Sequence, residues 1–345
     1  MNLETKSAYA DLALPDILIR ARVGLQGFAD RWSAVWFDSD MAGVRLDLRF
    51  GSFKVLAAWF KWDEGLLREG SLSPDDRSTP AIGGVSAEDD TDLWAVRVTH
   101  TPGETLTTGL DAYLLNNKTA GASLYYLGLR AEYDTPLVRL DGWVLYNHGD
   151  AGGGENVSGL AAAIRGEKSL RNVPVSVRLL YFSGDHDVAD GDRTYIQVQM
   201  PEDARPFADA DLMILLADRD RTTYGQPGFA MVDAAWQGYG LWGGVITAKY
   251  VRKIRARPYL RAALAHLRSL EDELAPGDPR GDRGGKTIGT ELAVRLGFTP
   301  VEPVELSLNG AYALLGDFYD GLAPNRPGTD PDSAYALCVM INIPF

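Results

Sequence analysis

The chain has one cysteine, four histidines and no run of about 18 apolar residues. A single cysteine excludes an internal disulfide framework and a zinc site built from several cysteines. Without a long apolar run there is no candidate transmembrane helix. The net charge of −13 leaves no basic surplus, so we expect no nucleic-acid partner. The opening residues, MNLETKSAYADLALPD, lack a basic segment followed by an apolar one, so we expect no secretory signal peptide in this sequence.

Sequence signatures of catalysis are also absent. The chain contains no GxSxG motif, and no Walker or dinucleotide-binding glycine pattern stands between a strand and a helix. His148 and His186 each have a serine and an aspartate nearby in sequence, but a catalytic triad requires these groups to be close in space. We therefore expect no enzymatic activity and no cofactor.

The dominant pattern is an alternation of apolar and polar residues with a period of two, which is typical of β-strands. In the stretch AGVRLDLRF, for example, Val44, Leu46 and Leu48 alternate with Arg45 and Asp47. The pattern predicts about fourteen strands of about ten residues, a length that suits a tilted strand crossing a bilayer. The expected strands span residues 16–28, 41–50, 53–62, 92–101, 104–115, 122–134, 137–147, 156–167, 174–183, 241–251, 256–268, 286–298, 303–315 and 334–345. Two further strands, one of them at TYIQVQM, would make the total about sixteen.

The predicted connections alternate between short and long along the chain. Outer-membrane barrels have short turns at one end and long loops at the other, whereas a soluble β-sandwich gives no reason for such sorting. Aromatic residues also stand near the predicted strand ends, where an interfacial girdle would lie. These residues are Trp59, Tyr125, Tyr133, Tyr146, Tyr181, Tyr250 and Tyr312. We therefore predict an all-β fold: a transmembrane antiparallel up-and-down β-barrel with short periplasmic turns and long extracellular loops, formed by residues 1–345 as a single domain.

The last eleven residues, YALCVMINIPF, form a strand with one completely apolar face. That face consists of Tyr335, Leu337, Val339, Ile341, Ile343 and Phe345. The stretch resembles the closing strand of the outer-membrane β-barrels of Gram-negative bacteria, which ends in phenylalanine and is read by the outer-membrane assembly machinery. The resemblance implies a closed barrel in the outer membrane, in contact with the lipid bilayer and lipopolysaccharide, whose last strand pairs with the first. The arginine-rich strands resemble those of porins and, more distantly, those of alginate-export barrels.

If the apolar faces point to lipid, the residues between them line the lumen. Basic residues outnumber acidic ones among them, while most acidic residues of this acidic chain fall in the long loops. The residues expected to line the pore are Arg20, Arg22, Arg45, Asp47, Arg49, Arg97, Arg130, Glu132, Arg139, Arg165, Arg178, Arg257, Arg261 and Arg295. These arginines either pair with carboxylates across strands and stiffen the wall, or form a ladder that selects anions.

Residues 184–240 form a segment that is too long for an ordinary loop and contains apolar stretches such as DLMILLADRD. Apolar residues in an extracellular loop need a place to be buried, so we expect the segment to fold inward as a constriction or plug; an extracellular cap is the alternative. Asp185, Asp187, Asp190 and Asp192 lie close together at its start. They are candidate calcium ligands, although their spacing is not that of an EF-hand.

These features favour an outer-membrane channel through which small hydrophilic solutes diffuse passively, anions and acidic saccharides above all. An export channel for an acidic exopolysaccharide of the alginate type is one alternative. A plugged barrel with a structural or adhesive role is another. Nothing in the sequence marks a subunit interface, so we expect a monomer.

Overall fold

Fifteen strands of one sheet account for most of the structured chain. The computed structural model describes residues 7–14, 18–33, 35–63, 91–118, 121–151, 156–171, 173–185, 207–218, 226–227, 229–252, 254, 257–274, 282–320 and 332–342. The strands of the sheet are β1 (Ala8–Leu14), β2 (Ile19–Ala29), β3 (Asp38–Phe50), β4 (Phe53–Asp63), β5 (Thr91–His100), β6 (Leu106–Asn117), β7 (Ala122–Asp134), β8 (Arg139–Asp150), β9 (Asn156–Leu170), β10 (Val173–Phe182), β13 (Leu241–Val251), β14 (Tyr259–Arg268), β15 (Thr287–Val301), β16 (Val304–Leu315) and β17 (Ser333–Asn342). A two-stranded pair, β11 (Ala217–Asp218) and β12 (Gln226–Pro227), and one short helix, α1 (Phe229–Asp233), lie between β10 and β13.

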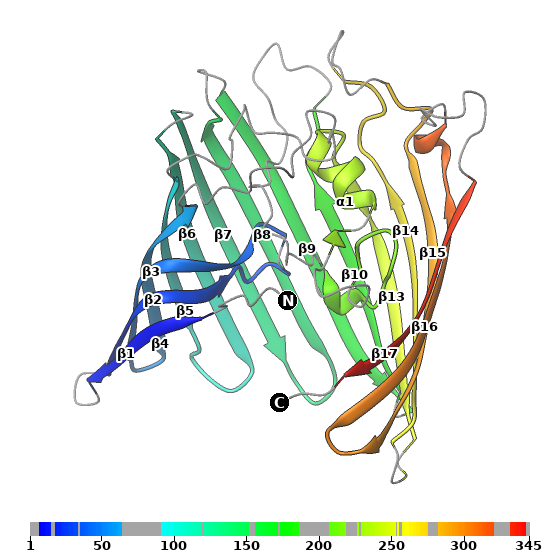
Figure 1. Cartoon of the computed structure of the whole chain (residues 1–345), viewed down its shortest axis with the longest axis horizontal. Helices are drawn as coiled ribbons and strands as arrows, with labels where there is room; N and C mark the ends of the chain where they lie inside the picture. Colours follow the sequence, from blue (N-terminus) through cyan, green and yellow to red (C-terminus); the bar gives the residue numbers. More distant parts are fainter. Residues whose placement is uncertain are drawn as a thin grey trace, which may run out of the picture.

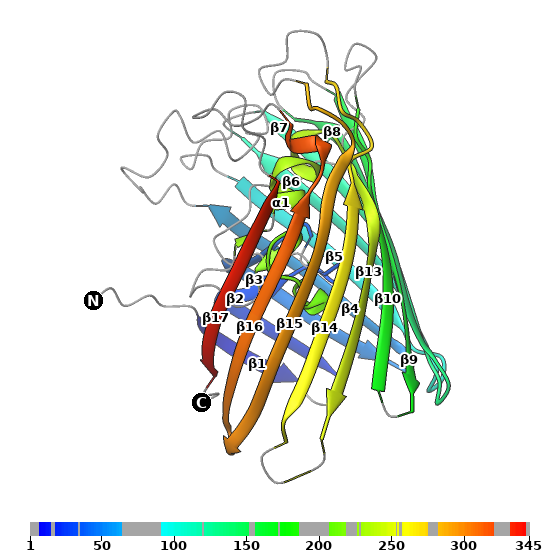
Figure 2. The same cartoon turned by 90° about the vertical axis from the view of Figure 1, so that its right-hand side faces the viewer.

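Every pair of neighbouring strands in the sheet is antiparallel and follows chain order, with β10 paired to β13 across the long segment between them. The sheet is strongly curved, and α1 lies on its concave side (Figure 1). Figure 2 shows the tilt of the strands from the side on which β13–β17 lie. No helix in the described part of the chain is long and apolar enough to cross a membrane.

All the strands predicted from alternation are present, and the sheet has one more, β1. β1 has only 7 residues, rich in alanine, so its alternation is too short to be recognised as a strand. The connections follow the predicted sorting in the main: those at one end are short, as at 51–52 and 135–138, and those at the other include all the long ones, as at 64–90 and 183–240. The connections at 118–121 and 151–155 are short although they lie at the second end. The stretch TYIQVQM, proposed as a further strand, lies outside the described residues.

The convex face is apolar through the middle of the strands. On β7, Leu127 and Leu129 are about half exposed, whereas Tyr126 and Gly128 on the other face are buried. Trp59, Tyr125 and the other aromatic residues predicted at the strand ends also lie on this outer face. A charged group on a lipid-facing strand costs about 2–4 kcal/mol at the bilayer midplane, which explains why the charges of the central strand segments lie on the concave face.

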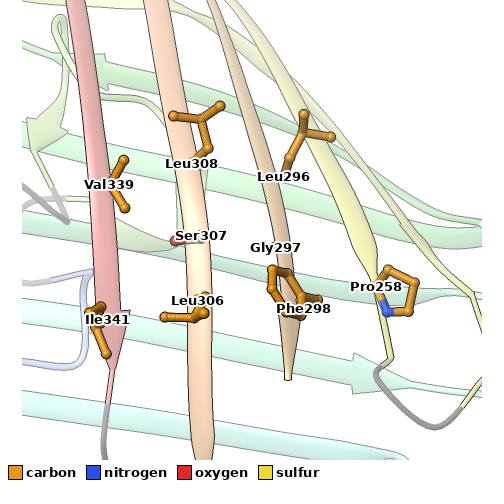
Figure 3. Close-up of a pocket in the computed structure, with 9 residues that line it drawn as sticks. All are labelled: Pro258, Leu296, Gly297, Phe298, Leu306, Ser307, Leu308, Val339 and Ile341. Atoms are coloured by element: carbon orange, nitrogen blue, oxygen red, sulfur yellow. The ribbon is translucent and has the colours of Figure 1, made fainter. Parts of the chain in front are cut away.

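A shallow apolar groove crosses the convex face of β15–β17 near the short turns. Leu296, Phe298, Leu306, Leu308, Val339 and Ile341 line it together with Pro258 (Figure 3). Ser307, between two of these leucines, is buried on the inner side. Because its lining is almost entirely apolar, the groove belongs to the lipid-facing surface and is unsuited to a hydrophilic solute.

β1 and β17 are the two edges of the sheet, and they are not paired with each other in the described part of the chain. The outward side chains of β17 are accordingly more exposed than those of inner strands: Tyr335 is 81% exposed, against 49% for its neighbour Tyr312 on β16. The pairing of the last strand with the first therefore stays a prediction. Ile343 and Phe345 of the terminal motif lie outside the described residues.

The connection between β2 and β3 folds into the concave side of the sheet. Asp30 holds it there by accepting hydrogen bonds from the backbone N–H groups of Trp32, Trp36 and Phe37 at 2.7, 2.7 and 2.9 Å. The side chains of these three residues are fully buried. Burial raises the pKa of Asp30 to about 6, although the three N–H groups and Arg97 act to lower it.

The rings of this connection pack on β6 and β7. The ring of Trp36 lies 4.5 Å from that of Tyr113 and 4.3 Å from that of Tyr126. Trp32 covers Gly128, where a Cβ atom would lie only 2.0 Å from Cζ2 of the indole. Glycine at this position therefore makes room for the tryptophan, and the interior beside β2–β8 is an aromatic core.

Replacing Gly128 with alanine is expected to displace Trp32 and destabilise the fold by about 1–3 kcal/mol, the usual cost of overpacking. Urea unfolding in detergent and acrylamide quenching of tryptophan fluorescence measure the two effects. Gly109→Ala on the inner face of β6 is the matched control, because a Cβ there meets its nearest atoms at 3.6 and 3.8 Å. Equal stability of the two variants would contradict the packing of Trp32 on Gly128.

The raised pKa of Asp30 predicts a pH dependence of stability. Between pH values of about 4 and 6 the folded chain binds the Asp30 proton more tightly than the unfolded chain, so the free energy of unfolding rises as the pH falls, by at most about 3 kcal/mol. Urea unfolding between pH 8 and pH 4 measures this slope, because this range contains the window between the two pKa values. Asp30→Asn should flatten it, and Asp282→Asn, at an exposed loop position, should leave it unchanged. A slope that survives Asp30→Asn would assign it to another group.

Candidate functional site: the charged lumen and its inward loop

The concave face of the sheet carries the residues predicted to line the pore, with one exception. Strand registers and the burial of alternate residues place them on this side, mostly in the half of each strand nearer to the short turns. Arg257 instead lies in the turn between β13 and β14, where it is exposed and pairs with Glu302 at 3.1 Å. The aromatic core occupies the half nearer to the long loops. The lumen thus has an apolar half and a charged half.

The arginines of β2 and β3 are largely paired. Arg20 donates from Nε to Asp11 of β1 at 2.7 Å, and Nη2 of Arg22 lies 3.1 Å from the same carboxylate. Arg45 pairs with Asp47 two residues along β3 at 2.8 Å. Asp11 belongs to β1, the strand that alternation missed, so the sequence alone did not offer this carboxylate as a partner for Arg20 and Arg22. Arg49, which was also predicted to line the pore, is exposed at the end of β3 that lies near the short turns.

The arginines of β5–β8 have partners as well. On β7, Arg130 pairs with Glu132, and Arg139 of β8 lies 3.9 Å from Glu132. Arg97 on β5 is buried, donates from Nε to the hydroxyl of Tyr113 at 2.6 Å and lies 4.2 Å from the ring centroid of Phe28. Cross-strand pairing thus stiffens this part of the wall.

A different arrangement occurs on the opposite wall, where residues 207–218, here termed the inward loop, run along the concave face over β9–β15. Asp209 bridges two strands: Nη1 of Arg165 on β9 lies 2.8 Å from Oδ2, and Nη1 of Arg178 on β10 donates to Oδ1 at 2.7 Å. Asp211 lies 3.0 Å from Nη1 of Arg261 on β14 and 4.0 Å from Nη1 of Arg295 on β15. The four arginines Arg165, Arg178, Arg261 and Arg295 are termed the arginine belt.

A buried carboxylate of the wall fixes the next part of the inward loop. Glu291 on β15 accepts hydrogen bonds from the backbone N–H groups of Met213 and Leu215, both at 2.7 Å, and of Ile214 at 3.2 Å. The apolar side chains of residues 212–216 are all buried. The apolar stretch noticed in the sequence is thus packed inside the sheet, with its backbone donors satisfied by the wall.

The inward loop also meets the aromatic core. The backbone N–H of Phe207 donates to the carbonyl of Ser33 at 2.9 Å. The ring of Phe207 stacks on Trp143 of β8 at 6.3 Å and lies edge-on to Phe182 of β10 at 6.2 Å. Two connections that enter from different strands therefore touch on the concave side of the sheet.

Electrostatics favour an ionised Asp209. Burial acts to raise its pKa, but the hydrogen bond from Arg178 and the charges of Arg178 and Arg165 outweigh burial and hold the pKa below its usual range. At neutral pH this carboxylate therefore neutralises part of the arginine belt.

Sequence reasoning named the belt arginines but gave no role to Asp209 and Asp211. In the sequence they resemble the many other acidic residues of the long loops. The available signal was their position directly before a buried apolar run, since an apolar run that folds inward carries its neighbours into the lumen. Of the calcium candidates, Asp187, Asp190 and Asp192 lie outside the described residues, so that site stays a prediction.

Solved structures with a similar fold come from Gram-negative bacteria. OccK8 (OprE) of Pseudomonas aeruginosa matches with a TM-score of 0.56 at 12% identity, over 97% of this chain and 79% of that one. OccK5 (OpdH) of the same organism gives 0.53 at 11% identity, over 96% and 80%. OccAB4 of Acinetobacter baumannii gives 0.51 at 11% identity, over 94% and 71%. No family model matches the chain, and no curated protein matches it.

These structures are outer-membrane porins of the Occ/Opd group. At 11–12% identity the likeness is one of fold. The fold is the one predicted from the sequence, that of an outer-membrane β-barrel, and the likeness supports the predicted location in the outer membrane.

Proposed function

We propose that this chain is a passive channel for small hydrophilic solutes in the outer membrane of a Gram-negative bacterium, with a preference for anions or acidic saccharides. The arginine belt is the observation that carries the preference. Four arginines from β9, β10, β14 and β15 project into the charged half of the lumen, where they meet two aspartates of the inward loop. Rings of arginine set anion preference in pores because they attract anions and repel cations.

The belt differs from the paired arginines of β2–β8 in the origin of its acids. Those arginines meet carboxylates fixed on the same or the next strand, which cannot leave without unfolding the wall. All four belt arginines meet aspartates on a loop inside the lumen, and Arg165 also pairs with Glu167 of its own strand. Solutes that pass the inward loop therefore travel past guanidinium groups whose counter-charges lie mainly on a separate segment.

The width of the pore and the electric field of its charged side chains then determine which solutes pass. We propose no catalytic step. The convex face packs against bilayer lipid. We also propose contact with lipopolysaccharide at the long-loop end, recognition of β17 by the outer-membrane assembly machinery, and a monomeric state.

Neutralising Arg261 and Arg295 together as glutamines should reduce the preference for anions by roughly threefold, since two partly neutralised charges that together act at about thermal energy in a wet lumen change local anion concentrations by a factor of about e. The measurement is the reversal potential of single channels in a planar bilayer under a KCl gradient. Discrete current steps of the parent protein are expected in the same recordings.

Arg257→Gln is the matched control, because Arg257 lies in the turn outside the strands and pairs with Glu302. It should leave the reversal potential unchanged. Parent protein that inserts but gives no current steps would overturn the open channel. Steps without anion preference would overturn the selectivity and leave a general porin.

A further inference from the structure

We propose that Asp209 and Asp211 are tethered competitors for the arginine belt, so that an entering anion must displace residues 209–211 of the inward loop from the wall in order to bind, while Glu291 keeps residues 213–215 in place. The inference rests on the proposed function, because it concerns the same arginines. It adds that the loop carries the groups that an anion would replace, and that the constriction is therefore opened by the ions it admits.

The first supporting observation is the geometry of Asp209. Its carboxylate bridges two arginines that belong to adjacent strands, with contacts of 2.7 and 2.8 Å. The side chain of Arg178 is only 6% exposed beneath it, whereas the side chain of Asp209 is 46% exposed. The carboxylate thus lies between a buried guanidinium and the open lumen, where a soluble carboxylate would have to lie to make the same hydrogen bonds.

The second observation is that the arrangement is repeated two residues later. Asp211 meets Arg261 and Arg295 with a single oxygen, at 3.0 and 4.0 Å. The Nε atom of Arg261 is buried and has no hydrogen-bond partner in the described part of the chain. Asp211 therefore leaves this donor of Arg261 unused, and an anion with more acceptor oxygens could accept a hydrogen bond from it.

The third observation concerns the strength of the tether. Between its two aspartates the loop contributes one small residue, Ala210, which is 3% exposed. A carboxylate held on a short segment acts as a competitor at an effective concentration in the millimolar range or above. Free anions at lower concentration leave the loop in place, and higher concentrations exchange with it.

Accessibility of Ala210 provides a test that does not depend on current. In a Cys338→Ser background, Ala210→Cys places one thiol under the inward loop, and its rate of reaction with a small maleimide reports release of the loop. Succinate is the probe anion, with sodium chloride at equal ionic strength as the comparison. We expect succinate to raise the rate by roughly fivefold over chloride, since it favours the released loop by its affinity for the belt.

The double variant Asp209→Asn/Asp211→Asn, in the same background, should react fast without succinate. In planar bilayers succinate should block its current at a concentration about tenfold lower than in the parent, since no tethered competitor remains. Glu167→Gln is the control: it removes a carboxylate 2.5 Å from Arg165 that lies on β9 and not on the loop. Its labelling rate should stay within about twofold of the parent, because the loop contacts are intact.

The outcomes separate the two proposals. Equal labelling in succinate and chloride, or equal labelling of the Asp209/Asp211 double variant and Glu167→Gln, overturns the tethered competitor even where the parent conducts anions. Unchanged succinate block in a double variant that conducts normally overturns it as well. A parent without anion preference overturns the proposed selectivity instead, whatever the labelling shows.

Discussion

Backbone hydrogen bonding in hydrocarbon is the constraint on which the rest of this structure depends. No water is present there to satisfy an exposed N–H or C=O group, so strands can cross only when each ladder is paired with a neighbour. Fifteen strands in unbroken chain order meet that requirement everywhere except at the two edges. Once the ladders exist, side chains alternate between lipid and lumen, and the high cost of charge in lipid moves the arginines and acids of the central strand segments to the inner face.

The inner face of the sheet must then either pack against other side chains or be polar enough to contact water, and this chain shows both arrangements. Beside β2–β8, the connection from Asp30 to Phe37 supplies rings that pack on Tyr113 and Tyr126, and Gly128 removes the atom that would collide with Trp32. Nearer to the short turns the wall is charged, and its arginines keep it polar. The inward loop joins the two regions, since Phe207 packs in the aromatic part and Asp209 pairs in the charged part. A solute path therefore depends on where this loop lies.

The sequence contains the strands in a form that can be recognised, because a period of two over ten residues is a long local signal. The lengths of the connections also show, from the sequence alone, that short turns and long loops fall at opposite ends of the strands. β1 was missed because 7 residues give too little signal, and with it the partner of Arg20 and Arg22 was missed. The pairing of Asp209 with Arg178 joins residues 31 positions apart, one of them in a segment without periodicity. Local patterns specify neither the path of such a segment nor the acids that reach the wall.

The edges of the sheet impose the remaining constraint. Because each strand reverses the direction of its neighbour, β1 and β17, the first and last of fifteen, run in the same direction. A direct pairing between them is therefore parallel, which is slightly less stable per residue than the antiparallel pairs elsewhere. β2 runs opposite to β17 and would form an antiparallel seam, but β1 occupies its edge from Ile19 to Leu25. Since an open edge in hydrocarbon leaves backbone groups without partners, closure of the barrel by the described strands alone requires either a parallel seam or the departure of β1 from β2.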